Sequence, residues 1–155
     1  MKLAPHIFAL AVLATACRLD SLGPQQRALR LEGAIGRPTI GVGDTTSLIF
    51  RLRNVSRQPV TLTFSSSCQV LPYITARQTD QIVYPGGNWL CLTVVTSLTL
   101  APGTEEVITV LVQGAAPGHA NPPGVPLPPG EYLAYARLAR SDFDLRSDAV
   151  PFTVN

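Results

Sequence analysis

The sequence predicts an all-β protein, folded as an antiparallel sandwich of about seven to nine strands. Three observations predict it. Apolar and polar residues alternate with a period of two in one run after another, as in half-buried strands. Turns rich in Gly, Pro and Asn separate these runs at short intervals. No stretch combines a 3.6-residue apolar period with a cap at each end, so we expect no helix in the domain.

The alternating runs place one set of apolar side chains on one face. Strands are expected over residues 29–35, 48–53, 60–65, 68–76, 82–84, 90–100, 106–112, 132–138 and 150–154. Their inward members should form one core, made of Leu48, Phe50, Leu52, Val60, Leu62, Phe64, Tyr132, Leu138, Phe152 and Val154. Pro72 interrupts one strand and predicts a sheet edge or a bulge there, because proline has no N–H for a ladder.

The N-terminal segment is typical of a secretory signal peptide. Lys2 is followed by the apolar run 7–16 and by small residues before Cys17. Leu13-Ala14-Thr15-Ala16-Cys17 resembles the lipobox of bacterial lipoproteins. The resemblance implies cleavage before Cys17 and a diacylglycerol joined to its sulfur by a thioether. The alternative is an ordinary secretory signal with an incidental cysteine.

The expected organisation follows from this reading. Residues 1–16 form a lipoprotein signal peptide, residues 17–27 the lipidated cysteine and a tether, and residues 28–155 one domain. The apolar run is shorter than the roughly 20 residues that span a bilayer. We therefore expect the lipid to hold the domain at the extracytoplasmic side of a bacterial envelope, on the periplasmic face or the cell surface.

Composition narrows the class of protein. The chain is 46% hydrophobic and only 14% charged, which favours a folded domain over disorder. Its basic residues are spread along the sequence with no run, so we expect no nucleic-acid partner. We expect a monomer, and no cofactor.

The chain has three cysteines, and two remain for pairing once Cys17 is assigned to lipid. Cys68 and Cys91 are then predicted to form a disulfide, because export places them in an oxidising compartment. Two alternatives stay open: a pair of free thiols, or a zinc site completed by His119. We expect no metal.

Three segments of the chain resemble the BsuPI-type intracellular proteinase inhibitor family. They are the hairpin of residues 48–56 and 59–64, the Leu100-Ala101-Pro102-Gly103-Thr104-Glu105 turn, and the Leu127-Pro128-Pro129-Gly130-Glu131-Tyr132 approach to a late strand. Residues 68–91 depart from the family pattern. The resemblance implies an immunoglobulin-like β-sandwich and, as a function, a proteinase-inhibitor-like module.

Signals for catalysis are weak. The chain has no Gly-x-Ser-x-Gly motif, and the only histidine after the signal peptide is His119, in a proline-rich stretch, so we do not expect an enzyme. Asp142 and Asp144 are candidates for a calcium ligand pair, or else polar surface residues around Phe143. Glu105 and Glu106 are adjacent and point to opposite faces of a strand.

Two further patterns have competing interpretations. Trp89, Tyr73 and Tyr84 form either a sugar-stacking platform or packing near the cystine. Asn54-Val55-Ser56 is a glycosylation sequon in form, but turn chemistry, in which Asn54 bonds the local backbone, is the better interpretation.

The Pro- and Gly-rich loop 114–130 is the candidate contact surface, because proline restricts a loop to few shapes before it binds. Its alternative is a crossover stiffened by proline. The candidate contact residues are Pro117, His119, Asn121, Pro123, Val125 and Leu127. We expect a membrane-anchored extracytoplasmic domain that binds a protein, such as a protease. The alternative is a structural or assembly lipoprotein of the envelope with no protease target.

Overall fold

The computed structural model describes residues 27–84, 91–113 and 127–155. The predicted signal peptide, Cys17 and all of the tether before Arg27 lie outside the described residues. So do Trp89, Pro117, His119, Asn121, Pro123 and Val125.

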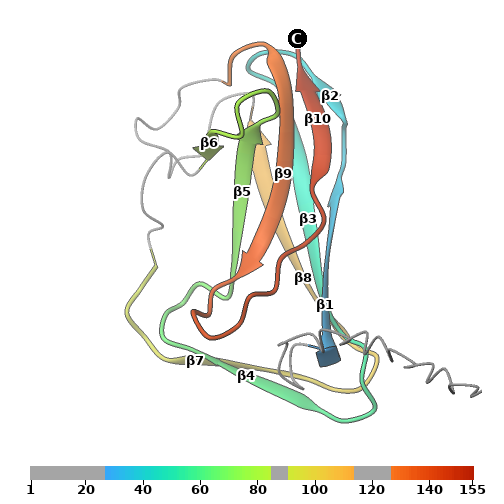
Figure 1. The fold of residues 1–155 in the computed structure, drawn as a ribbon, viewed down its shortest axis with the longest axis vertical. Helices are drawn as coiled ribbons and strands as arrows, with labels where there is room; N and C mark the ends of the chain where they lie inside the picture. Colours follow the sequence, from blue (N-terminus) through green and yellow to red (C-terminus); the bar gives the residue numbers. More distant parts are fainter. Residues whose placement is uncertain (1–26, 85–90, 114–126) are drawn as a thin grey trace, which may run out of the picture.

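The described residues form ten strands, and only Arg27 and Ala28, just before β1, are helical, which confirms the all-β prediction (Figure 1). The strands are β1 (Leu29–Ile35), β2 (Thr39–Ile40), β3 (Thr45–Asn54), β4 (Val60–Phe64), β5 (Val70–Ala76), β6 (Ile82–Tyr84), β7 (Thr96–Leu100), β8 (Glu105–Gln113), β9 (Gly130–Leu138) and β10 (Val150–Val154). The count exceeds the expected seven to nine mainly through β2, which has two residues. In the described part of the chain no helix is long and apolar enough to cross a membrane.

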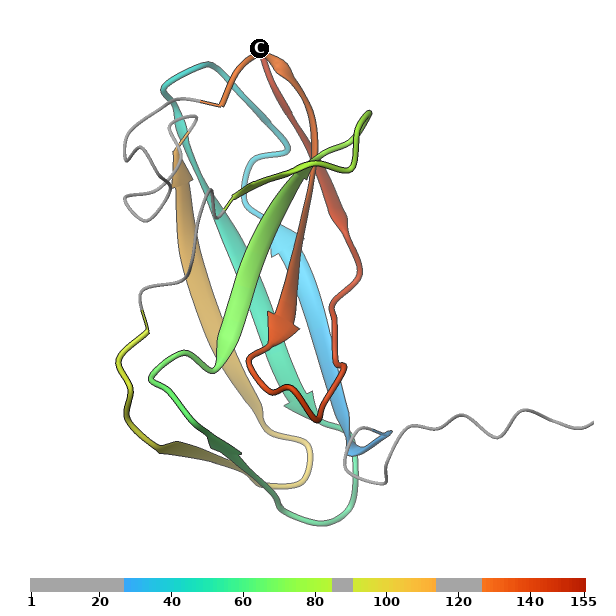
Figure 2. The ribbon, with the colours of Figure 1, turned by 60° about the vertical axis from the view of Figure 1, so that its left-hand side comes forward.

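Two sheets pack face to face (Figures 1 and 2). One has the strand order β1-β3-β8, and the other has the order β2-β10-β9-β5-β6. β4 and β7 form a separate two-stranded ribbon beyond the ends of β3 and β8. Every strand pairing among the described residues is antiparallel except the two-residue contact of β2 with β10. The predicted antiparallel sandwich is therefore observed, with one short parallel contact.

The core lies between the two sheets. All ten side chains expected to face inward are buried, from Leu48 and Phe50 on β3 to Phe152 and Val154 on β10. The alternation set the register, because a slip of one residue would turn each strand's apolar side chains to the solvent. The predicted core is thus confirmed residue by residue.

Pro72 lies where the ladder does not need its missing N–H. It is opposite Ala136 of β9, but Ala136 exchanges hydrogen bonds with Ser147 on its other side. Pro72 therefore occupies a position without hydrogen bonds to β9. On its other flank β6 reaches only Ile74 and Thr75, where the register shifts. The predicted edge is therefore found locally at Pro72, and the irregularity of the ladder lies two residues later, between Ile74 and Thr75.

The β7–β8 turn follows from its residues. Thr104 N–H donates to Ala101 O at 3.1 Å, and Gly103 has a φ of 75°. Proline at the second position and a glycine with positive φ at the third are the requirements of a type II turn. The turn places the start of β8 beside the end of β3.

One strand is shorter than predicted. Residues 91–95 are not part of a strand, and β7 begins only at Thr96. The prediction of a strand over 90–100 is wrong in its first half as far as the described residues reach. The reason is a tie to residues 66–68, which fixes the segment in another shape.

Candidate binding surface at the disulfide

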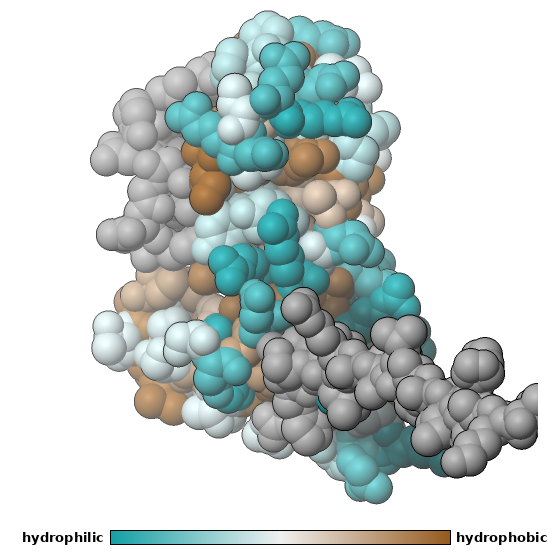
Figure 3. Space-filling view, viewed as in Figure 1, coloured by the Kyte–Doolittle hydropathy of each residue, from teal (hydrophilic) through white to brown (hydrophobic). Residues whose placement is uncertain are grey.

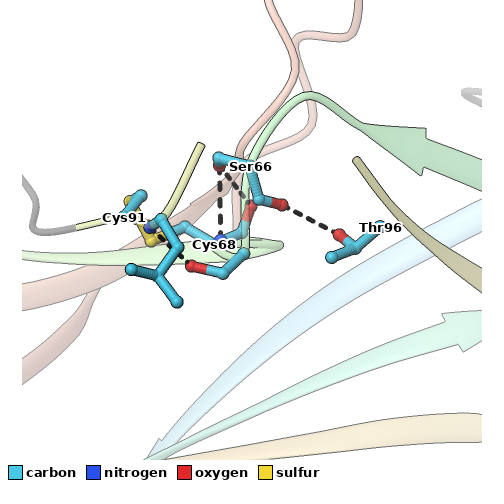
Figure 4. Close-up of a disulfide and its surroundings, with 6 residues drawn as sticks. Ser66, Cys68, Cys91 and Thr96 are labelled. Carbon is cyan, nitrogen blue, oxygen red and sulfur yellow. Dashed lines mark hydrogen bonds between the residues drawn. A yellow bond between two sulfur atoms is a disulfide. The ribbon is translucent and has the colours of Figure 1, made fainter. Parts of the chain in front are cut away.

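Cys68 and Cys91 form the predicted disulfide, with their Cα atoms 5.5 Å apart (Figure 4). The pairing rules out both alternatives for these two residues, since neither sulfur is a free thiol or a thiolate ligand. The bridge joins the stretch before β5 to the stretch before β7. Two segments that are 23 residues apart in sequence are therefore held side by side.

Hydrogen bonds strengthen this tie on both sides of the cystine. Ser67 N–H donates to Leu92 O at 3.0 Å, and Leu92 N–H donates to Ser67 Oγ at 2.9 Å. Thr96 Oγ1 donates to Ser66 O at 2.8 Å (Figure 4). Ser66 Oγ in turn accepts from Cys68 N–H at 3.3 Å. The segment is therefore clamped at its two ends, by Cys91 and Leu92 at one end and by Thr96 at the other.

The clamped segment, Cys91–Val95, presents apolar side chains to solvent. Val94 N–H donates to Leu92 O at 2.9 Å, which closes a tight three-residue turn around Thr93. Leu92 and Val95 are each 74% exposed, and Val94 is also exposed. Figure 3 shows hydrophobic surface at the lower left, where Figure 1 places the chain that leads into β7. The result is a small apolar protrusion on a fixed backbone.

Leu127, predicted as a contact residue, is instead part of the core. Its side chain is only 4% exposed and packs in the main hydrophobic cluster. Just after it, Tyr132 Oη donates to Pro128 O at 2.7 Å and fixes the approach to β9. The prediction for Leu127 is wrong, because an aliphatic side chain beside the sandwich is more stable buried than exposed.

A small pocket lies beside that approach. It measures about 250 Å³ and is lined by Ala76, Gln78, Thr79 and residues 128–132. Arg77 and Glu131 form an ion pair of 3.4 Å next to it. The volume falls below the roughly 300–1,000 Å³ of ordinary small-molecule sites.

Asp142 and Asp144 do not face a common point. Arg140 Nη2 donates to Asp142 Oδ2 at 2.7 Å, and Arg137 Nη2 donates to Asp144 Oδ1 at 3.1 Å. The hydrogen bond from Arg140 holds the pKa of the Asp142 carboxyl below its usual value. Within the described residues no group of three or more acidic, His or Cys side chains is placed to hold a metal. The surface interpretation of the two aspartates is the one that this geometry favours.

Tyr73 and Tyr84, two of the residues considered for a sugar-stacking platform, have different surroundings. Tyr84 is buried in the core, whereas Tyr73 stacks on Tyr135 with ring centroids 5.2 Å apart. The Arg146 guanidinium lies 3.5 Å from the centroid of the Tyr135 ring. Tyr73 and Tyr84 therefore do not form one platform, and packing accounts for Tyr84.

Asn54 confirms the turn interpretation of its sequon. Its side chain is fully buried. Asn54 Oδ1 accepts from Ser56 N–H at 2.9 Å, and Asn54 Nδ2 donates to Gln58 O at 2.8 Å. A buried amide with these partners is a turn anchor and does not present a glycosylation site.

Leu92, Val94 and Val95 were not predicted as contact residues, because their β-forming sequence assigned them to a strand. One signal was present: Val94 and Val95 are adjacent, and alternation places only one of them inward. Two adjacent apolar residues that interrupt the alternation, a few residues after a disulfide-bonded cysteine, can therefore indicate an exposed segment instead of a strand.

Comparisons with known proteins support the fold. No family model matches the sequence, and no curated protein matches it. A β-glucosidase from Erythrobacter marinus matches with a TM-score of 0.50 and 16% identity, over 82% of this chain and 15% of that one. A CARDB domain from Pyrococcus furiosus matches with a TM-score of 0.47 and 18% identity, over 82% of this chain and 94% of that one.

These likenesses bear on architecture alone. The chain spans about a sixth of the length of the β-glucosidases that it matches, among them one from Listeria innocua with a TM-score of 0.48, 12% identity and coverage of 82% of this chain and 16% of that one. At such identities a shared fold carries no shared activity. The described residues form a small antiparallel β-sandwich that contains the Cys68–Cys91 disulfide.

Proposed function

We propose that this chain is a membrane-anchored extracytoplasmic binding domain that engages a protein partner through the clamped segment Cys91–Val95. The observation that carries the proposal is the exposure of Leu92 and Val95, 74% each, on a backbone held by a disulfide and hydrogen bonds. Clustered apolar side chains that stay exposed on a soluble domain commonly mark a contact site.

The clamp explains how so small a protrusion gives useful affinity. Binding normally costs the ordering of the loop that binds. Here the disulfide and the bonds from Ser66 and Ser67 have already ordered the segment. Most of the free energy gained by burying Leu92 and Val95 therefore remains available for binding.

The chemistry of the segment defines the partner site. Cys91–Val95 carries no charge, so it fits an apolar pocket on the partner rather than an acidic or basic one. The resemblance to the BsuPI-type family makes an extracytoplasmic protease the partner class that we propose. Protease–inhibitor pairs are typically pre-organised on both sides, as this segment is.

The anchor determines where such a partner is met. Lipid on Cys17 with the tether that extends to residue 27 keeps the domain within roughly 40 Å of the membrane. We therefore place the protein in the bacterial envelope, with the partner in or close to the same membrane.

Site-specific photo-crosslinking in intact envelopes tests the proposal. The crosslinking residue replaces Leu92 in one strain and Val55, which is 52% exposed, in the control strain. We expect one protein to crosslink from position 92 and not from position 55. That protein is then purified and titrated with the wild-type chain, with Leu92→Ser plus Val95→Ser, and with Val55→Ser.

The titration decides the outcome. Losing two buried aliphatic contacts should weaken binding by more than about tenfold, whereas Val55→Ser should change nothing. If the partner is a protease, its hydrolysis of a peptide substrate should fall as the wild-type chain saturates it. Binding that is insensitive to Leu92 and Val95 refutes this site. Binding without inhibition favours the assembly lipoprotein instead.

A further inference from the structure

We propose that two copies of this chain pair through β8, antiparallel and two-fold symmetric about Thr109, so that their three-stranded sheets become continuous. The starting observation is the position of β8. Among the described residues it pairs with β3 alone, and Figure 2 shows it at one margin of its sheet with β1 at the other.

The two margins of this sheet differ in chemistry. β1 presents Arg30 and Glu32, which form an ion pair of 2.9 Å. Charges of this kind protect an open edge from pairing with another chain. On the same face β8 presents Val107 and Leu111, which are 45% and 63% exposed. The run from Val107 to Val112 has no charge, proline or glycine, so β8 lacks that protection.

The register shows which backbone groups of β8 face its open side. Asn54 N–H donates to Thr104 O on the β8 side, whereas Ser47 O accepts from Gly36 N–H on the β1 side. Bonding direction alternates along a strand, so the even-numbered residues of β3 bond to β8. Their register partners are also even-numbered, as in Phe50 opposite Ile108.

The odd-numbered residues of β8 therefore direct their N–H and C=O groups away from β3. These residues are Val107, Thr109 and Leu111, the same ones whose side chains are exposed. The open side of β8 thus offers a row of donors and acceptors at alternate residues that no other described strand uses, which is what an incoming strand requires.

A second copy fits this row. With Thr109 opposite Thr109 of the other copy, Val107 is opposite Leu111, and each of these pairs is of the type that exchanges two N–H···O bonds. Glu105 is opposite Gln113 and Glu106 is opposite Val112, so no two like charges face each other. Glu105 is also balanced within its own chain by Arg51, at 2.7 Å. The edge is therefore complementary to itself.

Disulfide trapping tests this register in the full chain, in membranes. The two-fold pairing places the Cα atoms of position 109 about 5.5 Å apart, within reach of a disulfide. Thr109→Cys should give a disulfide-linked dimer without added crosslinker. Thr99→Cys, an exposed threonine on β7, is the matched control and should stay monomeric. Equal dimer yields from the two variants, or a link from position 109 to a different protein, would overturn the proposal.

The mass of the detergent-extracted protein gives an independent measurement. Wild type should sediment as a dimer, Leu111→Lys as a monomer with an unchanged far-UV spectrum, and Val55→Lys as a dimer. A monomeric wild type would overturn the proposal and restore the monomer expected from the sequence. That result would leave the proposed binding function untouched, because the two rest on different residues.

Discussion

At the scale of single residues, Asn54 illustrates how one buried side chain joins three segments. Its Nδ2 donates to Gln58 O and to Leu100 O, and its Oδ1 accepts from the backbone N–H and the hydroxyl of Ser56. All of its side-chain hydrogen-bonding groups have partners, which is what makes burial of an amide tolerable. The end of β3, the turn after it and the end of β7 are held together as a result.

Asn54→Ala should therefore lower the free energy of unfolding by at least about 2 kcal/mol, because it leaves several buried groups without a partner at about 1–3 kcal/mol each. Urea titration of the purified chain measures the loss. Ser56→Ala is the matched control and should cost only about 1 kcal/mol, since it removes a hydroxyl and leaves the Asn54 amide bonds to Gln58 and Leu100 in place. A cost below about 1 kcal/mol for Asn54→Ala would contradict this account.

Burial raises the pKa of Tyr84 and of Tyr132 above the ordinary value. A raised folded-state pKa means that the native state favours the neutral phenol. This contribution is complete below the unfolded value of about 10 and is lost as the pH rises through the folded-state pKa.

Stability should accordingly fall above about pH 10. Residues 17–155 contain no lysine, so phenols account for most titration in this range. Urea titrations at several alkaline pH values measure the fall, and phenolate absorbance follows the ionisation. Tyr84→Phe plus Tyr132→Phe should reduce the pH dependence. An unchanged dependence in that double variant would assign it to other groups.

At the scale of elements, the disulfide decides where β7 begins. Residues 91–95 have a sequence rich in β-formers, yet the backbone of Leu92 bonds to Ser67 and not to a strand partner. Tertiary constraints of this kind override a local preference of a few tenths of a kcal/mol per residue.

Replacing Cys68 and Cys91 together with Ala should therefore have a global and a local effect. The loss of a loop constraint over 23 residues should lower the free energy of unfolding by about 3 kcal/mol. Hydrogen exchange should become faster at the Leu92 amide, which donates to Ser67 Oγ, but much less so at Leu98 within β7. Undiminished protection at Leu92 would mean that hydrogen bonds alone hold the segment.

At the scale of the whole molecule, the proposed anchor and the sandwich are joined by a short connection at one end of the domain. Arg27, the first described residue, lies two residues before the start of β1, and β1 begins opposite the end of β3. The domain end that holds Arg27 is therefore the end that we expect to face the membrane.

Cys17→Ser should move the chain from the membrane fraction to the soluble fraction, or leave an unprocessed precursor, because the proposed acyl chains are its anchor. Fractionation with immunoblotting measures this, and radiolabelled palmitate tests for the lipid directly. Cys68→Ala plus Cys91→Ala is the control and should stay in the membrane fraction. A processed Cys17→Ser chain that remains in membranes would refute lipidation at this residue.

Local pattern was enough to predict most of the strands and the core. Phe50, Leu62 and Phe152 are buried where a period of two places them, because each strand has one face that must leave water. The turn at Asn54 and the tight turn at Pro102-Gly103 were likewise readable, since both depend on the chemistry of adjacent residues.

The sequence by itself thus determined the all-β class, the inward faces and the pair of cysteines that bridge. Only the tertiary structure decided which strands are neighbours, that Leu127 lies in the core, and that Leu92 and Val95 are exposed on a clamped segment. It also decided that β8 lies at a margin of its sheet. The physical reason is that alternation determines only which face of its own strand a residue occupies. The order of neighbouring strands and the exposure of a residue depend on contacts between segments far apart in sequence.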